Sequence, residues 1–301
     1  MSDTIEAVME RLNELPLFFV AGLPRSGTTW LQQMLNAHPQ VLCLGESHFI
    51  NEMVPDLYKV LSRYRKQREA GQRTWAPGVV GPTTEHMGPI FRTAFAALAA
   101  ANIGDKDVGR LMAIGEKNPD NLMYAERLWR IFPKARVIHI IRDPRDGAVS
   151  GFARFRPRLP QEMTRAQYVD AYSKDWVRRI AEVRSIAGDH PYMEIRYEDL
   201  HADTTGRAAE LFRFIGVSDD PADVAAATEA TSFEKLSGGR KQGEADAASH
   251  YRRGEVGGWR DDLAPEEVGI AERNAGEMLT SLGYDLAGSA EGAPPGVAEP
   301  R

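Results

Sequence analysis

Apolar residues gather along this chain in four short runs bounded by turn residues. Runs of this length, rich in Val, Ile, Leu and Phe, are typical of strands buried on both faces of a sheet. The clearest run ends at Arg142 and is followed by Asp143 and Pro144, a pair that suits a helix N-terminus. The pattern predicts strands over residues 17–23, 41–44, 137–142 and 191–197.

The segments that follow these runs have the composition of helices, and breakers such as His38-Pro39 separate them from the next run. Strands that alternate with helices over this length indicate a mostly parallel sheet with helices on both faces, which is the α/β class. The predicted helices cover residues 26–37, 144–155, 204–215 and 265–282.

Three segments interrupt the alternation. Residues 52–115 are mainly helical and are interpreted as an insertion that caps the acceptor site. Residues 237–258 contain six glycines in twenty-two positions, which predicts a mobile loop. Residues 287–301 are rich in Pro, Gly and Ala, which predicts a disordered tail. Residues 1–286 are then expected to form one domain.

Composition narrows the class of partner and compartment. The net charge is −6, which argues against nucleic acid or an anionic membrane as the main partner. Cys43 is the lone cysteine, so no disulfide forms within the chain and a reducing compartment fits. No apolar run approaches the roughly 20 residues that a membrane span needs. These features predict a soluble cytoplasmic protein.

A phosphate-binding loop is predicted between the first strand and the first helix. Gly22 and Gly27 have the spacing of the Walker A frame of P-loop proteins, but Thr28 occupies the lysine position. Since that lysine normally holds β- and γ-phosphates, its absence favours a ligand with a single 5′-phosphate group. Arg25 supplies a cation inside the loop. The alternative is a plain strand–turn–helix whose glycines serve only the turn.

The segment Pro24-Arg-Ser-Gly-Thr-Thr-Trp30 resembles the 5′-phosphosulfate loop of the sulfotransferases that use 3′-phosphoadenosine-5′-phosphosulfate (PAPS). Arginine at position 25, where many members have lysine, is similar to the protein-tyrosine and several bacterial branches. The resemblance implies a P-loop-type α/β fold, PAPS as co-substrate, 3′,5′-adenosine bisphosphate (PAP) as product, and no metal. It implies that the co-substrate is held by Arg25, Ser26, Gly27, Thr28, Thr29 and Trp30.

Two further motifs resemble the part of the family's site that holds the 3′-phosphate. Arg142 and Ser150 have the spacing of the arginine and serine that bind this group. Residues 251–260 resemble a closing segment that adds a basic side chain and backbone amides. In this segment Arg252, Arg253 and Gly254 are the candidates, and the choice between the two arginines stays open because Gly258 replaces an aspartate of the family pattern.

Four residues match family positions that surround the adenine base: Trp30, Tyr197, Thr231 and Phe233. Aromatic stacking with a few polar contacts is the usual way to hold such a base. Without the resemblance, the three aromatic residues would be interpreted as core residues, which aromatic residues more often are.

Sulfuryl transfer needs fixed cations and a group that takes the acceptor's proton. Arg25 is one cation, and Lys117 matches a lysine that the family places beside the sulfate. The histidine of the cytosolic branch is replaced here by Pro119. Glu46 lies twenty-one residues after Arg25, where the protein-tyrosine and heparan branches carry a catalytic glutamate. His48 and Glu116 are the other candidates for the base, and the choice stays open.

The acceptor is not specified by these motifs, and a small molecule, a peptide or a glycan all fit. Residues 58–73 concentrate basic side chains that suit an acidic acceptor, although such runs are usually solvated helix faces. A homodimer is also open. Two rival functions are a P-loop small-molecule kinase, with Asp143 as a Mg²⁺ ligand, and a non-catalytic nucleotide-binding relative.

Overall fold

The computed structural model describes residues 4–72, 79–240 and 254–288. These residues fall into two compact units. The first unit consists of Met1–Ile141 and Val183–Lys241, and the second of Arg142–Glu182 and Gln242–Arg301. The expectation of one domain over residues 1–286 stays a prediction.

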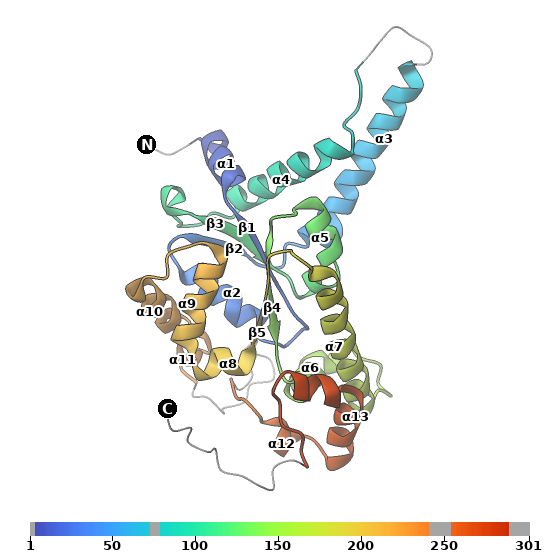
Figure 1. The fold of residues 1–301 in the computed structure, drawn as a ribbon, viewed down its shortest axis with the longest axis vertical. Helices are drawn as coiled ribbons and strands as arrows, with labels where there is room; N and C mark the ends of the chain where they lie inside the picture. Colours follow the sequence, from blue (N-terminus) through green and yellow to red (C-terminus); the bar gives the residue numbers. More distant parts are fainter. Residues whose placement is uncertain (1–3, 73–78, 241–253, 289–301) are drawn as a thin grey trace, which may run out of the picture. The chain divides into compact units, whose positions relative to one another are not determined.

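The described part of the first unit is built on a five-stranded parallel sheet with the strand order β2-β3-β1-β4-β5 (Figure 1). This confirms the predicted α/β class and all four predicted strands. The sequence pattern missed β3, because its Gly-Glu-Lys half is not apolar. The strands are β1 Leu17–Ala21, β2 Val41–Leu44, β3 Ala113–Lys117, β4 Arg136–Ile141 and β5 Tyr192–Arg196.

The central strand β1 is buried on both faces, as its apolar run predicts. Phe18 and Val20 belong to one core cluster together with Leu31, whereas Phe19 points to the other face and packs on Phe95, with ring centroids 5.7 Å apart. This alternation follows from the two-residue period of a strand. The two faces of the sheet therefore bury separate hydrophobic layers.

Helices cover both faces of this sheet (Figure 1). On one face lie α2 Thr28–Ala37, α8 Tyr197–Ala202, α9 Thr204–Ile215 and α10 Pro221–Ala230, followed by α11 Phe233–Leu236. On the other lie α1 Ile5–Glu14, α4 Thr84–Ala101 and α5 Ala125–Ile131.

The connections that leave neighbouring strands β1 and β3 run to opposite faces of the sheet. The chain passes from β1 into α2 on one face, and from β3 into α5 on the other (Figure 1). Loops that diverge in this way open a crevice at the carboxyl ends of the strands, where α/β proteins bind their ligands. The fold therefore directs attention to the residues that follow β1 and β3.

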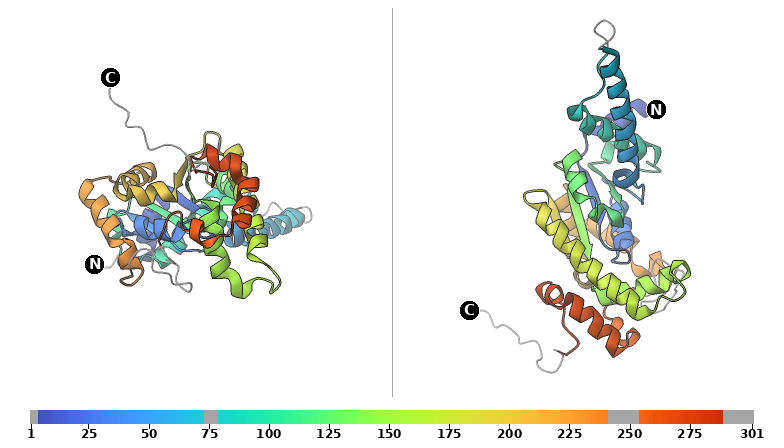
Figure 2. Two further views of the ribbon diagram at one scale, coloured as in Figure 1. Left: turned by 90° about the horizontal axis from the view of Figure 1, so that it is seen from below. Right: turned by 90° about the vertical axis from the view of Figure 1, so that its right-hand side faces the viewer.

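The predicted helical insertion contains α3 Val54–Gln72, α4 and a 3₁₀ turn, Val108–Arg110. Helix α3 extends outward from the rest of the first unit in both views (Figures 1 and 2). It is preceded by a short π-helix, Phe49–Met53, which follows the end of β2 closely. The base of α3 is thus tied to the carboxyl edge of the sheet by only a few residues.

The described part of the second unit is helical. It contains α6 Pro144–Phe155, most of α7 Arg165–Ala187, α12 Trp259–Asp262 and α13 Pro265–Ser281. Helices α6 and α13, together with α2 and α9 of the first unit, confirm the four helices predicted from the sequence. None of the helices in the described ranges is long and apolar enough to cross a bilayer.

The two segments predicted to be mobile or disordered lie largely outside the described residues. The structure describes positions 237–240 and 254–258 of the Gly-rich loop and positions 287–288 of the tail. Both expectations stay predictions.

Candidate active site

The phosphate loop (residues 22–27) lies where β1 passes into α2. Arg25 and Gly27 both have positive φ, 75° and 100°, and the Ser26 N–H donates to the Leu23 carbonyl at 3.1 Å. Gly27 precedes the first turn of α2, and no side chain caps that turn. An uncapped helix N-terminus directs backbone N–H groups and the positive end of the helix dipole outward. The loop thus has the form of an anion site.

The Ser26 hydroxyl is the clearest sign that the loop is built for a ligand. The residue is 2% exposed, and its Oγ has no hydrogen-bond partner among the described residues. A buried hydroxyl without a partner is costly unless a ligand or water satisfies it. Gly27 leaves no room for a side chain, since a Cβ there would lie 2.5 Å from the Tyr197 ring. A phosphate oxygen fits this donor set, so the residues present suit the co-substrate.

Glu46 and Lys117 meet at the carboxyl edge of the sheet. Lys117 is the last residue of β3 and pairs in register with Val20 of β1, next to the phosphate loop. Its Nζ donates to Glu46 Oε1 at 2.6 Å. The Lys117 side chain is 6% exposed and that of Glu46 is 48% exposed. A buried ammonium thus holds a carboxylate that remains open to solvent.

His48 has an unusual backbone conformation. Among the described residues, Arg25 and His48 are the two non-glycine residues with a positive φ. Its φ is 54°, and its Nδ1 lies 3.1 Å from Asn51 Nδ2 and 3.4 Å from Asn118 Nδ2. The same nitrogen lies 3.7 Å from a carboxylate oxygen of Glu52. The His48 ring is thus held through Nδ1 by neighbouring polar side chains. Backbone outliers of this kind concentrate at functional sites.

Glu116, the third candidate for the base, is 0% exposed. Its Oε1 accepts the Ser47 N–H at 3.1 Å. Burial raises the pKa of this carboxyl, and hydrogen bonds from Ser47 and from the backbone N–H groups of His48 and Phe49 oppose the rise. The Glu116 carboxylate therefore contacts the turn that carries Glu46, and it is itself shielded from solvent.

Three of the predicted adenine residues come together. The Trp30 indole N–H donates to the Thr231 carbonyl at 3.0 Å, and the Trp30 and Tyr197 rings meet edge to face at 5.5 Å. Phe233 follows at the start of α11, with the Arg240 guanidinium 5.7 Å from its ring centroid. Chain positions far apart in sequence thus form one aromatic cluster, next to Gly27 through Tyr197.

The second unit holds the residues predicted for the 3′-phosphate. Arg142 donates to the Glu255 carbonyl at 2.8 Å, and the Arg142 carbonyl accepts the Trp176 indole N–H at 3.0 Å. Ser150 is buried on α6. Gly254 has a φ of 62°. Arg252 and Arg253 lie outside the described residues, so the choice between them stays open.

Sequence reasoning missed Asp146, which organises the segment that leads into α12. Its carboxylate accepts the N–H groups of Gly257 and Trp259, both at 2.8 Å. Burial raises the pKa of Asp146, and the Arg142 charge and these two hydrogen bonds lower it. The available signal was an acidic residue in the first turn of α6, which also has the common explanation of a favourable helix dipole.

Asp143, the residue on which the kinase alternative depended, is already engaged. Its two carboxylate oxygens accept three N–H groups of the Arg145 side chain and backbone at 2.7 to 3.0 Å. Arg145 in turn stacks on Trp259 at 3.8 Å and pairs with Glu272 at 2.7 Å. No cluster of metal-ligating side chains is found in the described ranges. Asp143 therefore has the role of a helix cap within a structural network.

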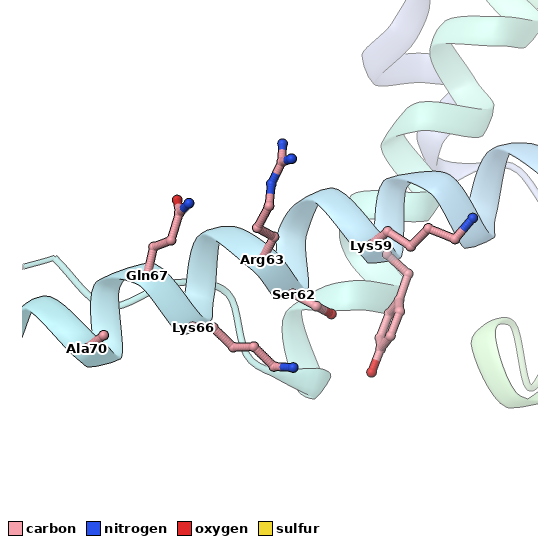
Figure 3. Close-up of a pocket in the computed structure, with 7 residues that line it drawn as sticks. Lys59, Ser62, Arg63, Lys66, Gln67 and Ala70 are labelled. Atoms are coloured by element: carbon pink, nitrogen blue, oxygen red, sulfur yellow. The ribbon is translucent and has the colours of Figure 1, made fainter.

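An open groove runs along α3 (Figure 3). Lys59, Arg63 and Lys66 recur at helical spacing beside it, and Figure 3 shows Ser62, Lys59 and Lys66 projecting from the helix. Tyr58 and Val60 are largely exposed in the same helix. The groove is lined by Tyr58, Lys59, Ser62, Arg63, Lys66, Gln67 and Ala70.

Comparison with known proteins agrees with this geometry. The model of the sulfotransferase family matches residues 16–221. Protein-tyrosine sulfotransferase 2 of Gallus gallus is 30% identical over 213 residues, which are 68% of this chain and 52% of the relative. Omega-hydroxy-beta-dihydromenaquinone-9 sulfotransferase Stf3 of Mycobacterium bovis is 28% identical over 181 residues, 56% of this chain and 40% of the relative. The chain thus spans about half or less of the length of these relatives.

The fold is also found among solved structures. The crystal structure of mouse sulfotransferase SULT7A1 complexed with PAP superposes with a TM-score of 0.54 at 17% identity, covering 91% of this chain and 88% of that chain. At this identity the likeness shows the fold alone. Because the family model spans more than half of the residues, including the phosphate loop, Glu46 and Lys117, the chain belongs to the sulfotransferase family.

Proposed function

We propose that this chain transfers a sulfuryl group from PAPS to a hydroxyl of an acceptor and releases PAP. The observation that carries the proposal is the pairing of Lys117 with Glu46 at the same sheet edge as the uncapped phosphate loop. Family membership supports it. A nucleotide-binding relative without turnover has no need for a buried lysine that holds an exposed carboxylate.

The phosphate loop binds the 5′-phosphosulfate in this proposal. Backbone N–H groups at the start of α2, with the hydroxyls of Ser26, Thr28 and Thr29, donate to the phosphate oxygens. Gly27 allows the close approach, and Arg25 neutralises charge on the sulfate. The unpartnered Ser26 Oγ supports this assignment, since a phosphate oxygen would satisfy it.

The rest of the nucleotide is assigned by chemistry to two groups of residues. The aromatic cluster of Trp30 and Tyr197, with Thr231 and Phe233, holds adenine. Arg142 and Ser150 hold the 3′-phosphate, joined by Gly254 and by Arg252 or Arg253. An arginine offers phosphate a planar fork of donors, to which a hydroxyl adds one more.

The chemistry is an in-line displacement. The acceptor oxygen forms a bond to sulfur while the bond from sulfur to the bridging phosphate oxygen breaks, so PAP leaves with that electron pair. Glu46 takes the acceptor proton, and Lys117 and Arg25 stabilise the charge that moves onto the equatorial and leaving oxygens. The bond from the Lys117 ammonium to the Glu46 carboxylate fixes the position of that carboxylate before the acceptor arrives.

A kinase is the weaker candidate. Its carboxylate Mg²⁺ ligand would be Asp143, whose oxygens are bonded to Arg145, and the Walker lysine position holds Thr28.

The measurement that decides between the two functions is thermal unfolding with PAP, set against ATP plus Mg²⁺. A ligand at 100 times its dissociation constant stabilises a fold by about 2.7 kcal/mol. Stabilisation by PAP that persists in EDTA is expected, and stabilisation by Mg·ATP alone would overturn the proposal.

Arg142 provides a sharper version of this test. PAP differs from 5′-AMP by the 3′-phosphate, so Arg142→Gln should lower the affinity for PAP by about 10- to 100-fold, the usual effect of losing a hydrogen bond to a charged group. The affinity for 5′-AMP should stay within about twofold. Equal losses for both nucleotides would show that Arg142 does not bind the 3′-phosphate.

The acceptor is proposed to carry acidic groups and to lie along α3. The face formed by Lys59, Arg63 and Lys66 carries three cations in a chain of net charge −6, of which Lys59 pairs with Asp56 at 2.8 Å. Helix α3 starts a few residues after Glu46. At about 1.5 Å per residue, the groove from Tyr58 to Ala70 is roughly 18 Å long, enough for an extended segment of about five residues. The protein-tyrosine sulfotransferase relatives make a peptide hydroxyl the first acceptor to try.

The acceptor proposal can be tested by binding. A tyrosine peptide flanked by Glu and Asp should bind more tightly than its Gln and Asn counterpart, with an affinity that falls as salt rises. The combined change Lys59→Gln, Arg63→Gln and Lys66→Gln should remove the difference. Its control changes three exposed cations on other helices to Gln, namely Arg130, Lys174 and Arg213. Equal binding of both peptides to the natural protein would overturn the proposal, whatever the result with PAP.

The proposed location is the cytoplasm. Cys43 is the lone cysteine of the chain and it is buried, so the fold does not depend on a disulfide.

A further inference from the structure

Two adjacent residues of β3 contact two adjacent residues of the turn that follows β2. Lys117 Nζ bonds to the Glu46 carboxylate at 2.6 Å, and Glu116 Oε1 accepts the Ser47 N–H at 3.1 Å. The strands are neighbours, with Leu44 and Glu116 in register. The turn (residues 45–49) is therefore attached to β3 at two points, one through a side chain and one through the backbone.

The backbone of this turn does not repeat a regular structure. His48 has a φ of 54°, and the π-helix Phe49–Met53 starts directly after it. The Ser47 N–H also donates to the Gly45 carbonyl at 2.8 Å, so the turn is sharp. A left-handed non-glycine residue is strained, and it persists only where the surroundings hold it. Something must therefore stabilise the turn.

The Glu116 carboxylate is the group that does so. It is fully buried, and its Oε1 accepts the Ser47 N–H at 3.1 Å, while its Oε2 has no hydrogen-bond partner among the described residues. The neighbouring backbone N–H groups of His48 and Phe49 also lower the pKa of this carboxyl. Consecutive backbone N–H groups that point at one anion form a nest, the arrangement that binds phosphates in other proteins. Here the nest is occupied by a side chain of the same chain. Its burial is repaid only if these hydrogen bonds are made.

We propose that Glu116 is a positioning residue, which holds the 45–49 turn and thereby places the Glu46 carboxylate at Lys117 and at the acceptor. Glu116 does not contact the acceptor and takes no proton from it. The inference rests on the proposed sulfuryl transfer for its kinetic readout. Its structural readout does not depend on turnover.

Two substitutions separate positioning from proton transfer. Glu116→Gln keeps an oxygen that accepts the Ser47 N–H but cannot act as a base. Glu116→Leu keeps a similar volume without any acceptor. If Glu116 positions the turn, Gln retains kcat within about threefold, whereas Leu lowers kcat by about 100-fold, the cost of a displacement of about 1 Å in an active site. The affinity for PAP stays within about twofold in both variants.

Two results would overturn the proposal. Loss of kcat in Glu116→Gln as large as in Glu116→Leu would make Glu116 a proton carrier. Unchanged kcat in Glu116→Leu would make the hydrogen bonds irrelevant to catalysis. If the Leu variant does not fold, Glu116→Asp replaces it: the carboxylate is withdrawn by one methylene group, so kcat should fall by about 10-fold or more with PAP affinity intact. Natural kcat in that variant also contradicts the proposal.

Hydrogen exchange of the Ser47 amide tests the same contact without an acceptor or a turnover. Exchange should be slow in the natural protein and in Glu116→Gln, and at least about 10-fold faster in Glu116→Leu or Glu116→Asp, because the N–H then keeps only the Gly45 carbonyl as a partner and the turn opens more often. Equal exchange in all variants would overturn the positioning role. A protein that shows the exchange difference but no sulfuryl transfer would instead refute the proposed function alone.

Discussion

The phosphate loop after β1 and the 45–49 turn after β2 both lead out of a buried strand, but their polar groups are arranged differently. Each leaves a buried parallel strand, and each contains one non-glycine residue with positive φ, Arg25 in the first and His48 in the second. The loop ends at Gly27 on a helix start without a side-chain cap, and the Ser26 hydroxyl has no partner in the described chain. In the turn, the Glu116 carboxylate accepts the Ser47 N–H through Oε1, so a buried side chain of the protein itself supplies the anion.

This difference separates two kinds of functional element. A loop whose donors are unsatisfied by the chain gains stability when an anion arrives, so it is suited to bind. A turn whose backbone is bonded to a buried carboxylate of its own chain is held in place before any ligand arrives, so it is suited to place a reacting group. The comparison assigns binding to the first and positioning to the second, and the following changes test that division.

The largest effect is expected for Glu46→Gln. A general base contributes about 10²- to 10⁴-fold to rate, so kcat should fall by that factor while the affinity for PAP stays within about twofold. The exposed Glu126 on α5 provides the control, since Glu126→Gln should leave kcat unchanged. A Glu46→Gln enzyme of natural kcat would remove the turn from the catalytic machinery.

The next effect is expected for Gly27→Ala. Here both a φ of 100° and a Cβ placed 2.5 Å from the Tyr197 ring oppose a side chain, so the free energy of unfolding should drop by about 2 to 4 kcal/mol and PAP affinity should fall with it. Gly188→Ala is the matched control, with a φ of 45° and no atom within 4 Å of the added Cβ. Chemical unfolding of both variants separates backbone strain from the clash, and equal losses would mean that the loop is not tightly packed.

The third effect is a loss of stability in acid caused by His139, and it limits the pH range in which variants of the loop and of the turn can be compared. Burial lowers the pKa of His139 on β4 to about 4, and its Nδ1 lies 2.7 Å from the Tyr192 hydroxyl, which donates to Glu194 at 2.8 Å. Between pH 4 and 6.5 the unfolded chain therefore binds a proton on this residue that the folded chain does not. The free energy of unfolding is highest above pH 6.5 and decreases as the pH is lowered.

For His139 alone the loss between pH 7 and pH 5 should be about 2 kcal/mol. Urea unfolding at the two pH values measures it, and His139→Gln, which cannot take the proton, should flatten the difference. The same pH dependence in the variant would place the effect on other groups.

The smallest effect is expected for His48→Asn. Asparagine tolerates the left-handed region better than most residues, so the free energy of unfolding should change by less than about 1 kcal/mol. Because the His48 Nδ1 is engaged with the amides of Asn51 and Asn118 rather than with Glu46 or Lys117, kcat should fall by less than about 10-fold. A fall comparable to that of Glu46→Gln would make His48 the base and reverse the assignment within the turn.

The sequence alone determined the strands β1, β2, β4 and β5, the position of the phosphate loop and the family, because each depends on a local pattern. A buried strand needs a continuous apolar run, and a phosphate loop needs glycines at fixed spacing between a strand and a helix. The family motifs also predicted Arg25, Glu46 and Lys117 as site residues, and the structure brings the last two together.

Only the tertiary structure decided what the remaining polar residues do. Glu116 and Asp146 are ordinary acidic residues in the sequence, and both turn out to hold backbone N–H groups of segments 69 and more than 100 positions away. Asp143 likewise changes from a candidate metal ligand to a partner of Arg145. The physical reason is that burial and hydrogen-bond partners set the role of a charged side chain, and both arise from contacts that no local pattern of residues encodes.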